Sequence, residues 1–254
     1  MWRFVAILAS AACSFRPGDA PGDGGVSPDG IVVERGVIAR WDFEELGGAV
    51  AADTASKTSA LHLAIDAPAN VTWSGGALVI QGPVHLRSAT PATRIVDACR
   101  SSGALTIEAW LTPSDAVQDG PARVLSISSD ISHRNVTLAQ SGDSWVFRLR
   151  TDRTNDNGIP ELVTGPLIAA TPALTHVVVT HDGTDRIIYV DGVERARDAL
   201  GGSLAGWDAS FAVNVANEAG GAIDRFWLGA LHRIVVYERW LDAAEIERLH
   251  LRGL

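Results

Sequence analysis

Residues 105–111, LTIEAWL, decide the fold class, because apolar side chains occupy every second position of this run. In an extended strand successive side chains point to opposite faces, so Leu105, Ile107, Ala109 and Leu111 share one face. Glu108 and Trp110 share the other face. A strand that has one apolar face, suited to burial in a core, and another face that carries polar residues is typical of an antiparallel sheet.

Shorter runs of the same kind occur along most of the chain. We predict strands at residues 37–43, 60–65, 77–80, 84–86, 123–128, 135–139, 144–150, 176–180, 186–190, 210–215 and 226–237. Many short strands separated by turn residues are typical of a sandwich of two antiparallel sheets. The sequence therefore predicts an all-β protein with such a sandwich.

Two Asp-Gly pairs mark tight turns in the second half of the chain. Asp182-Gly183 lies between two predicted strands, and Asp191-Gly192 ends the second of them. Asp-Gly readily adopts the positive φ angles that a tight hairpin turn requires. We therefore expect residues 176–190 to form a β-hairpin.

One short helix is predicted, at the C-terminal end. Asp242 can cap its first turn and Glu245 follows three residues later, as in a capping box. Leu241 and Ile246 form the matching pair of apolar residues across the cap. Gly253 is the residue at which we expect the helix to end.

The first residues have the composition of an export signal. Met1-Trp2-Arg3 carries one positive charge, residues 4–12 are apolar or small, and Cys13 follows directly. The apolar run is too short to cross a membrane, as in a signal peptide. The residues Ser10-Ala11-Ala12 before the cysteine resemble the lipobox of bacterial lipoproteins, although Ser10 replaces the usual Leu. A plain secretory signal with an incidental cysteine is the alternative.

These observations predict three regions in the chain. Residues 1–12 are expected to be a lipoprotein-type signal peptide, which implies export and lipidation of Cys13 at the cell envelope. Residues 13–30 are rich in Pro, Gly and Asp, so we expect a disordered linker. The folded domain is expected at residues 31–254. Ser14 stands where an inner-membrane retention signal would have Asp, which by resemblance favours the outer membrane.

Residues 39–44, ARWDFE, and residues 106–110, TIEAW, resemble two strands of the laminin-G-like domains, which are concanavalin A-like lectin/glucanase jelly rolls. Further similar segments follow in the order of that family, at residues 120–123, 134–140, 148–151, 157–160, 176–178, 189–193, 227–237 and 241–246. The resemblance extends over residues 37–254. It implies a two-sheet antiparallel jelly-roll sandwich with a short C-terminal helix.

The resemblance implies a fold that hosts lectins, adhesion modules and glycosidases alike. We expect a non-catalytic cell-surface binding module, for carbohydrate or protein recognition in adhesion. A glycoside hydrolase or lyase is the alternative, and a purely structural envelope lipoprotein is a third reading. The expected partners are a glycan or a surface protein, and the membrane is expected to be contacted through the lipid anchor only. The protein is expected to be a monomer.

Charge and motifs restrict these functions. The formal net charge is −9, whereas nucleic-acid binding needs clustered Lys and Arg, so no nucleic-acid partner is expected. Retaining glycosidases of this fold hold two carboxylates on one strand, and Asp42-Phe43-Glu44 is the closest such run. Because this run matches a scaffold motif of the resembled family, we predict no catalytic residue and no enzyme.

Glu108 is the carboxylate of greatest interest, because it shares a strand face with Trp110. A carboxylate on a partly covered sheet face needs a partner, since desolvating a lone charge is costly. The strand order of the resembled family implies an ion pair to Arg148 or Arg150. The other reading is a ligand groove in which these residues are contacts.

Further possible ligand contacts are Arg134, Asn135, Asn155 and Asn157. They lie at or between strand ends, where the loops of a sandwich usually carry binding sites. Turn formation and the pinning of loops are the structural alternative. The large aromatic residues are expected to be core rather than sugar platforms, above all Trp41, Trp145 and Trp227.

Relatives of the resembled family often bind calcium through oxygen ligands. Many of them carry an acidic residue at the start of the last strand, whereas residues 229–232 read GALH here. We therefore expect no cofactor, and Asp42 and Asp53 are the residues that could still contribute to a calcium site. Cys99 precedes the strand at residues 105–111 and is expected to be a buried free thiol.

Overall fold

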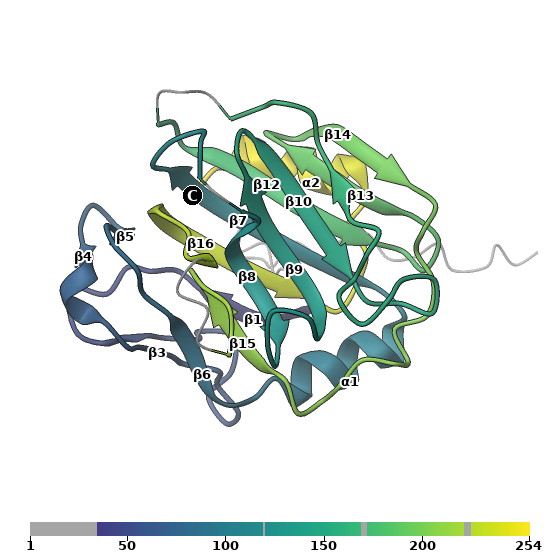
Figure 1. Cartoon of the computed structure of the whole chain (residues 1–254), viewed down its shortest axis with the longest axis horizontal. Helices are drawn as coiled ribbons and strands as arrows, with labels where there is room; N and C mark the ends of the chain where they lie inside the picture. Colours follow the sequence, from purple (N-terminus) through teal and green to yellow (C-terminus); the bar gives the residue numbers. More distant parts are fainter. Residues whose placement is uncertain (1–34, 119, 169–171, 221–224) are drawn as a thin grey trace, which may run out of the picture. The chain divides into compact units, whose positions relative to one another are not determined.

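Alternating apolar strands build two antiparallel sheets, which enclose the core between them (Figure 1). The computed structural model describes residues 35–118, 120–168, 172–220 and 225–254, and Gly36–Leu254 forms one unit. The predicted signal peptide at residues 1–12, the lipidated Cys13 and the predicted linker at residues 13–30 lie outside the described residues. None of the described helices is long and apolar enough to cross a lipid bilayer.

Eight strands form the first sheet. They are β1 (Val37–Trp41), β4 (Val71–Trp73), β5 (Leu78–Ile80), β7 (Leu105–Pro113), β12 (Thr175–His181), β13 (Arg186–Val190), β14 (Val193–Asp198) and β16 (Gly229–Tyr237). Seven follow the order β14-β13-β12-β7-β16-β5-β4, and β1 pairs with β16 beside this path. The strand that decides the fold class, β7, therefore lies in the middle of this sheet.

Eight strands also form the second sheet. They are β2 (Val50–Ala51), β3 (Leu63–Ile65), β6 (Leu86–Pro91), β8 (Ala122–Ser128), β9 (Arg134–Ser141), β10 (Ser144–Leu149), β11 (Leu162–Val163) and β15 (Ala212–Val215). Their order is β11-β10-β9-β8-β15-β6-β3-β2. The predicted all-β sandwich of two antiparallel sheets, of the jelly-roll type, is confirmed.

The core follows the alternation of the strands. Leu105, Ile107, Ala109 and Leu111 of β7 are 0% exposed and belong to the main hydrophobic cluster. Trp41, Trp145 and Trp227 lie in the same cluster and are also 0% exposed. These three tryptophans are therefore core residues, as predicted, and do not offer a surface on which a sugar could stack.

The C-terminal helix α2 (Ala243–Arg252) begins and ends as predicted. Asp242 accepts a hydrogen bond from the backbone N–H of Glu245 at 2.8 Å, and the Glu245 side chain accepts one from the backbone N–H of Asp242 at 3.1 Å. Leu241 and Ile246 are buried in a second apolar cluster on the outer face of the first sheet. Gly253 is the C-cap residue. The helix thus covers part of the first sheet.

Two further helical segments were not predicted. Helix α1 (Thr93–Ser102) connects β6 to β7, and the short 3-10 helix η1 (Pro68–Asn70) precedes β4. Ala92 at the N-cap of α1 makes no side-chain capping bond, so the start of α1 has no capping signal in the sequence. The expectation of a single helix is therefore wrong.

The turns between β12, β13 and β14 follow the two Asp-Gly pairs. Asp191 and Gly192 have φ angles of 52° and 77°, which matches a tight two-residue turn. Gly183 has a φ of 93°, and the Asp182 side chain accepts hydrogen bonds from the backbone of Thr184 and Asp185. The predicted hairpin of β12 and β13 is present, and β14 extends it.

The edges of both sheets are short, charged or covered. The edge strands β2, β4 and β11 contain only two or three residues each. The longer edge strand β14 has the sequence VERARD, with four charged residues. The outer edge of β1 is covered by residues 52–54 and by Arg94 of α1, whose guanidinium donates to the Ile38 carbonyl.

Candidate functional site

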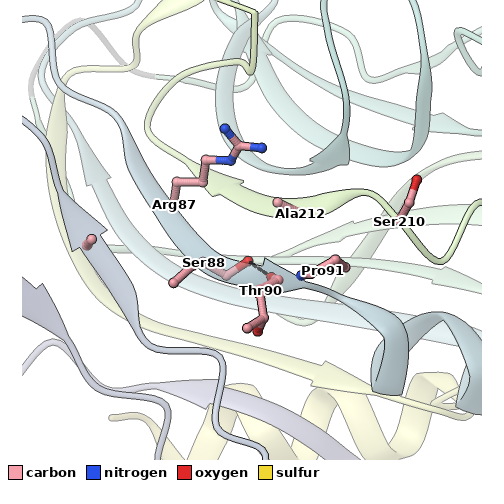
Figure 2. A pocket seen from close by; sticks show the side chains of 8 residues that line it. Arg87, Ser88, Thr90, Pro91, Ser210 and Ala212 are labelled. Carbon is pink, nitrogen blue, oxygen red and sulfur yellow. Dashed lines mark hydrogen bonds between the residues drawn. The ribbon is translucent and has the colours of Figure 1, made fainter.

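The outer face of the second sheet, which points away from the core, holds a pocket over β3, β6 and β15 (Figure 2). Strand β6 alternates, so that Leu86 is buried in the core while Arg87 and Ala89 are exposed. Strand pairing places Arg87 directly beside Ala64 of β3 and Asn214 of β15. The pocket is therefore built on neighbouring outward positions of three strands.

The pocket has a volume of about 380 Å³. Small side chains and a few polar ones line it: Ala64, Arg87, Ser88, Ala89, Thr90, Pro91, Ser210 and Ala212. Figure 2 shows Arg87 and Ser210 on either side of Ala212. Because the alanine side chains are small, they leave the pocket open. The polar side chains beside them can contact a ligand.

Arg87 differs from the two serines of the pocket, whose hydroxyl groups already have partners. The Ser210 hydroxyl donates to Asp208 at 2.6 Å, and this hydrogen bond lowers the pKa of that carboxyl. The Ser88 hydroxyl donates to the carbonyl of Thr90 at 2.7 Å. In the described part of the chain the Arg87 guanidinium makes no hydrogen bond and no ion pair. Its donors are therefore available to a ligand.

A series of hydrogen bonds connects His85, on the same face as the pocket, to the buried carboxylate of Glu218. Nε2 of the half-buried His85 lies 2.8 Å from Oδ1 of Asn214. The Asn214 amide donates to the Ser128 hydroxyl at 3.0 Å, and that hydroxyl donates to Glu218. These contacts fix the side chains beside the pocket.

Glu218 is the centre of a buried ion-pair cluster on the same face. Its Oε2 accepts from Arg123 Nε at 2.7 Å and from Arg134 Nη1 at 2.9 Å. All three side chains are at most 2% exposed. Burial lowers the pKa of both arginines, to about 10 for Arg134, although the Glu218 charge opposes this shift. The cluster needs Glu218, because without it two buried guanidinium groups would lose their counter-charge.

The loop after β15 covers one part of this face. Asn217, Glu218 and Ala219 are 5%, 1% and 1% exposed, and Glu218 contacts β8 and β9 through Arg123 and Arg134. The part of the face over β3 and β6 carries exposed residues instead. The Glu218 cluster therefore holds the loop at one side of the pocket.

Glu108 lies on the outer face of the first sheet, and its surroundings are structural. Its side chain accepts from Trp110 Nε1 at 3.1 Å and from the Tyr237 hydroxyl at 2.7 Å, and His176 Nε2 lies 3.3 Å from it. Burial alone would raise the pKa of Glu108, but the contacts with His176, Tyr237 and Trp110 keep it below the ordinary value. Trp110 stacks on His176 with ring centroids 4.4 Å apart and on His250 of α2 at 5.9 Å.

The predicted ion pair from Glu108 to Arg148 or Arg150 is wrong. Strand β7 pairs with β12 and β16, whereas Arg148 belongs to β10 and Arg150 follows β10, in the other sheet. The core separates the two faces. Arg148 pairs instead with Glu161 at 2.5 Å, and Arg150 pairs with Asp156 at 2.9 Å.

The remaining predicted contact residues shape turns and strand ends. Asn155 Oδ1 accepts from the backbone of Asn157 and Ile159, and Asn157 Oδ1 lies 3.4 Å from Arg148 Nη1. Asn135 exchanges hydrogen bonds with the backbone of Asp208 at 2.8 Å. Arg134 is part of the Glu218 cluster. The structure does not bring the predicted contact residues together into one groove.

Asp42 and Asp53, the two calcium candidates, face arginines. Asp42 Oδ1 accepts from Arg40 Nε at 2.8 Å and from Arg233 Nε at 3.0 Å. Asp53 forms an ion pair with Arg94 and accepts three backbone N–H groups. These contacts occupy the oxygens that a calcium ion would need, so the two residues do not fit such a site. No cluster of three or more metal-ligating side chains occurs among the residues that the structure describes.

The residues that line the pocket were not predicted from the sequence. The predicted strand at residues 84–86 ends just before Arg87, so its position on the outer face was missed. Glu218 lies in a loop after β15, and only the fold shows that this loop returns over the sheet. The outward alternation of Arg87 and Ala89 is the one signal that could have indicated this face.

Comparison with known families gives one match. The family model described as the concanavalin A-like lectin/glucanases superfamily matches residues 87–247. This range contains most of both sheets, and with them Arg87 and Glu218. A search of curated protein sequences finds no match.

Several solved structures are similar in fold. A Trypanosoma rangeli sialidase in complex with sialic acid gives a TM-score of 0.63 at 18% identity, over 91% of this chain and 36% of that chain. The binding domain of botulinum neurotoxin DC, in complex with rat synaptotagmin II, gives 0.58 at 13% identity, over 85% of this chain and 51% of that chain. This chain thus spans about a third of the sialidase and about half of the toxin domain. At these identities the similarity concerns the fold.

Proposed function

Because the chain belongs to the concanavalin A-like lectin/glucanases superfamily, we propose that its folded unit is a non-catalytic module that binds a glycan. Binding takes place on the outer face of the second sheet. The observation that carries this proposal is the pocket of about 380 Å³ with the exposed Arg87 in its wall. Pockets of roughly 300–1,000 Å³ are typical of small-ligand sites, which suits one or two sugar rings.

The compared structures support a binding role in general. The sialidase was solved with sialic acid and the toxin binding domain with rat synaptotagmin II. Chains with this fold therefore occur both in a sugar-binding protein and in a protein-binding one. A protein partner is the second candidate, but a specific protein interface usually buries about 800 Å² on each side. A small pocket lined by alanine and arginine favours the glycan.

Hydrolysis is less well supported than binding. Glycosidases need two carboxyl groups roughly 5–10 Å apart on either side of the bond to be cleaved. Among the described residues that line the pocket there is no Asp or Glu. Glu218 lies on the same face, but it is buried and its carboxylate is bound by Arg123 and Arg134. A carboxylate held in this way is unsuited to act as a nucleophile or a proton donor.

A glycan array tests this function. We expect the labelled full-length protein to bind a defined subset of the glycans, because a pocket with fixed polar groups selects among sugars. The same preparation, incubated with a panel of polysaccharides, is expected to release no reducing ends. Release of sugar products would favour the hydrolase or lyase, and absence of any bound glycan would contradict the proposal.

We further propose that the protein is exported and anchored to the cell envelope, at the outer membrane, by a lipid on Cys13. The support is in the sequence alone: one charge, an apolar run and the small residues Ser10-Ala11-Ala12 precede the cysteine. Residues 13–30 would then be the linker between the lipid and the binding module. In this arrangement the module acts as a monomer on the cell surface.

A further inference from the structure

We propose that the pocket over β3, β6 and β15 binds a sugar that carries a carboxylate, and that Arg87 is its charged contact. This inference rests on the proposed function and names the class of ligand for the same site. Three observations support it: the state of Arg87, the charge of the lining and the small apolar residues beside Arg87.

The first observation is that no described carboxylate pairs with Arg87. The other arginines on outward positions of this face have carboxylate partners, since Arg123 and Arg134 share Glu218 and Arg148 pairs with Glu161. Arg87 has neither an ion pair nor a hydrogen bond in the described part of the chain. A guanidinium presents two parallel N–H groups that match a carboxylate, which makes it a specific partner for this group.

The second observation is the charge of the pocket lining. Arg87 is the one charged residue among the described residues that line the pocket, and Asp208 reaches the lining only through the hydroxyl of Ser210. A ligand in the pocket therefore meets one positive charge and no carboxylate in the lining, which favours an anion.

The third observation is the lining beside Arg87. Ala64, Ala89 and Ala212 are small and apolar, so they can contact the C–H groups of a sugar ring. Ser210, whose hydroxyl hydrogen is directed to Asp208, keeps lone pairs that can accept from a sugar hydroxyl. A free inorganic anion would use the arginine alone, whereas a carboxylated sugar uses the whole pocket.

The test compares sugars that differ only in their charge. Trigalacturonate and its methyl ester differ only in the charge of their carboxyl groups, and so do sialyllactose and its methyl ester. We expect calorimetry to show that the full-length protein binds at least one of the acidic sugars on the order of tenfold more tightly than its neutral counterpart, the scale of a charge-assisted hydrogen bond. Added salt is expected to weaken the binding of the acidic sugar.

Arg87→Gln tests whether Arg87 is the charged contact of the sugar. It removes one charge from an exposed side chain, so the fold is expected to persist, and Arg248→Gln on the exposed side of α2 is the matched control. We expect Arg87→Gln to abolish the preference for the acidic sugar and Arg248→Gln to leave it unchanged.

The outcomes separate the two proposals. Equal binding of acidic and neutral sugars, with no effect of Arg87→Gln, would overturn this inference and leave the glycan-binding function intact. A preference for the acidic sugar that Arg87→Gln does not change would also overturn it, because the carboxylate would then bind elsewhere. If none of these sugars binds, the inference fails, and the glycan array decides whether the proposed function fails with it.

Discussion

Two buried glutamates, Glu108 and Glu218, lie on the outer faces of the two sheets, and different groups hold each of them. Glu218 faces two arginines, whereas Glu108 accepts hydrogen bonds from an indole and a phenol and lies beside an imidazole. A buried carboxylate is tolerated only when such partners replace the water that it loses. Glu218 belongs to the loop after β15 and holds it to the sheet, whereas Glu108 holds Trp110 and His176, on which His250 of α2 stacks.

Glu108→Gln is expected to lower the free energy of unfolding by about 1–3 kcal/mol at neutral pH, the scale of hydrogen bonds to a charged group. The pKa of Glu108 lies below its ordinary value of 4.5 in the folded protein. Its carboxylate thus stabilises the fold above that pH, and the stabilisation is lost as the pH falls through the lowered pKa. Urea unfolding at pH 7 and in acid is expected to show the difference between wild type and variant shrinking in acid.

A double-mutant cycle tests whether Tyr237 is a partner of Glu108. The effects of Glu108→Gln and Tyr237→Phe are expected to be non-additive, because their side chains share a hydrogen bond of 2.7 Å. The effects of Glu108→Gln and Arg148→Gln are expected to add, because these residues belong to different sheets. Coupling between Glu108 and Arg148 would contradict the arrangement of strands described above.

The sequence allowed us to predict that Glu108 needs a partner, but not which one. Alternation along one strand shows which side chains share a face, and this follows from local geometry. The neighbours of β7 are β12 and β16, which lie about 70 and 120 residues further along the chain. That pairing is a property of the whole sheet, so His176 and Tyr237 could not be identified from spacing. Arg87 was missed for a similar reason, since the pocket needs three strands.

At the scale of elements, the two ten-residue helices differ in how their first turns are stabilised. Helix α2 has a complete capping box between Asp242 and Glu245, and this pattern is visible in the sequence. Helix α1 follows Ala92, which offers no side-chain acceptor, and it is held by burial of Ile95, Val96 and Cys99. Tertiary packing thus replaces the cap in α1, which explains why the sequence predicted only one of the two helices.

Asp242→Ala is expected to destabilise the protein by about 1 kcal/mol, as is usual for loss of an N-cap. Asp97→Ala in the middle of α1 is the matched control, because this carboxylate is 63% exposed and lies 3.8 Å from Arg100. We expect thermal unfolding to show a lower midpoint for Asp242→Ala and almost no change for Asp97→Ala. An equal shift for both variants would contradict a specific capping role.

The C-terminal end of α2 contacts two of the residues that surround Glu108. His250 in the last turn of α2 stacks on Trp110 and His176, with centroid distances of 5.9 and 5.7 Å. Loss of the cap at the start of α2 and loss of the stack at its end act on the same element. Their effects are therefore expected to be coupled.

At the scale of the whole molecule, the sequence allowed a more complete prediction of the fold than of the binding site. Strand positions, turns and the closing helix are encoded in local patterns, and the match of the family model to residues 87–247 agrees with them. The binding face depends on which outward positions become neighbours and on a loop that returns over them. Such contacts join residues far apart in sequence, as Arg123 and Glu218 do, so no single motif contains them.

The proposed lipid anchor also belongs to this scale, because it would decide where the whole molecule acts. Cys13→Ala is expected to move the protein from the membrane fraction to the soluble fraction of bacterial cells and to abolish labelling by radioactive palmitate. Cys99→Ala is the control, because this free thiol is 0% exposed in α1 and is expected to carry no lipid. A wild-type protein as soluble as the Cys13→Ala variant, and without label, would show that no anchor is present.

The sheet edges have a consequence for proteins that are crowded together. Exposed strand edges can pair between copies and extend into fibrils, and short or charged edge strands prevent this. Here β2, β4 and β11 are too short to template a further strand, and β14 carries four charged residues, which oppose the burial of its edge against another strand. Many copies packed side by side would therefore remain separate units. A high density of the proposed binding module on a surface would then raise its avidity for a repetitive polymer, without formation of amyloid.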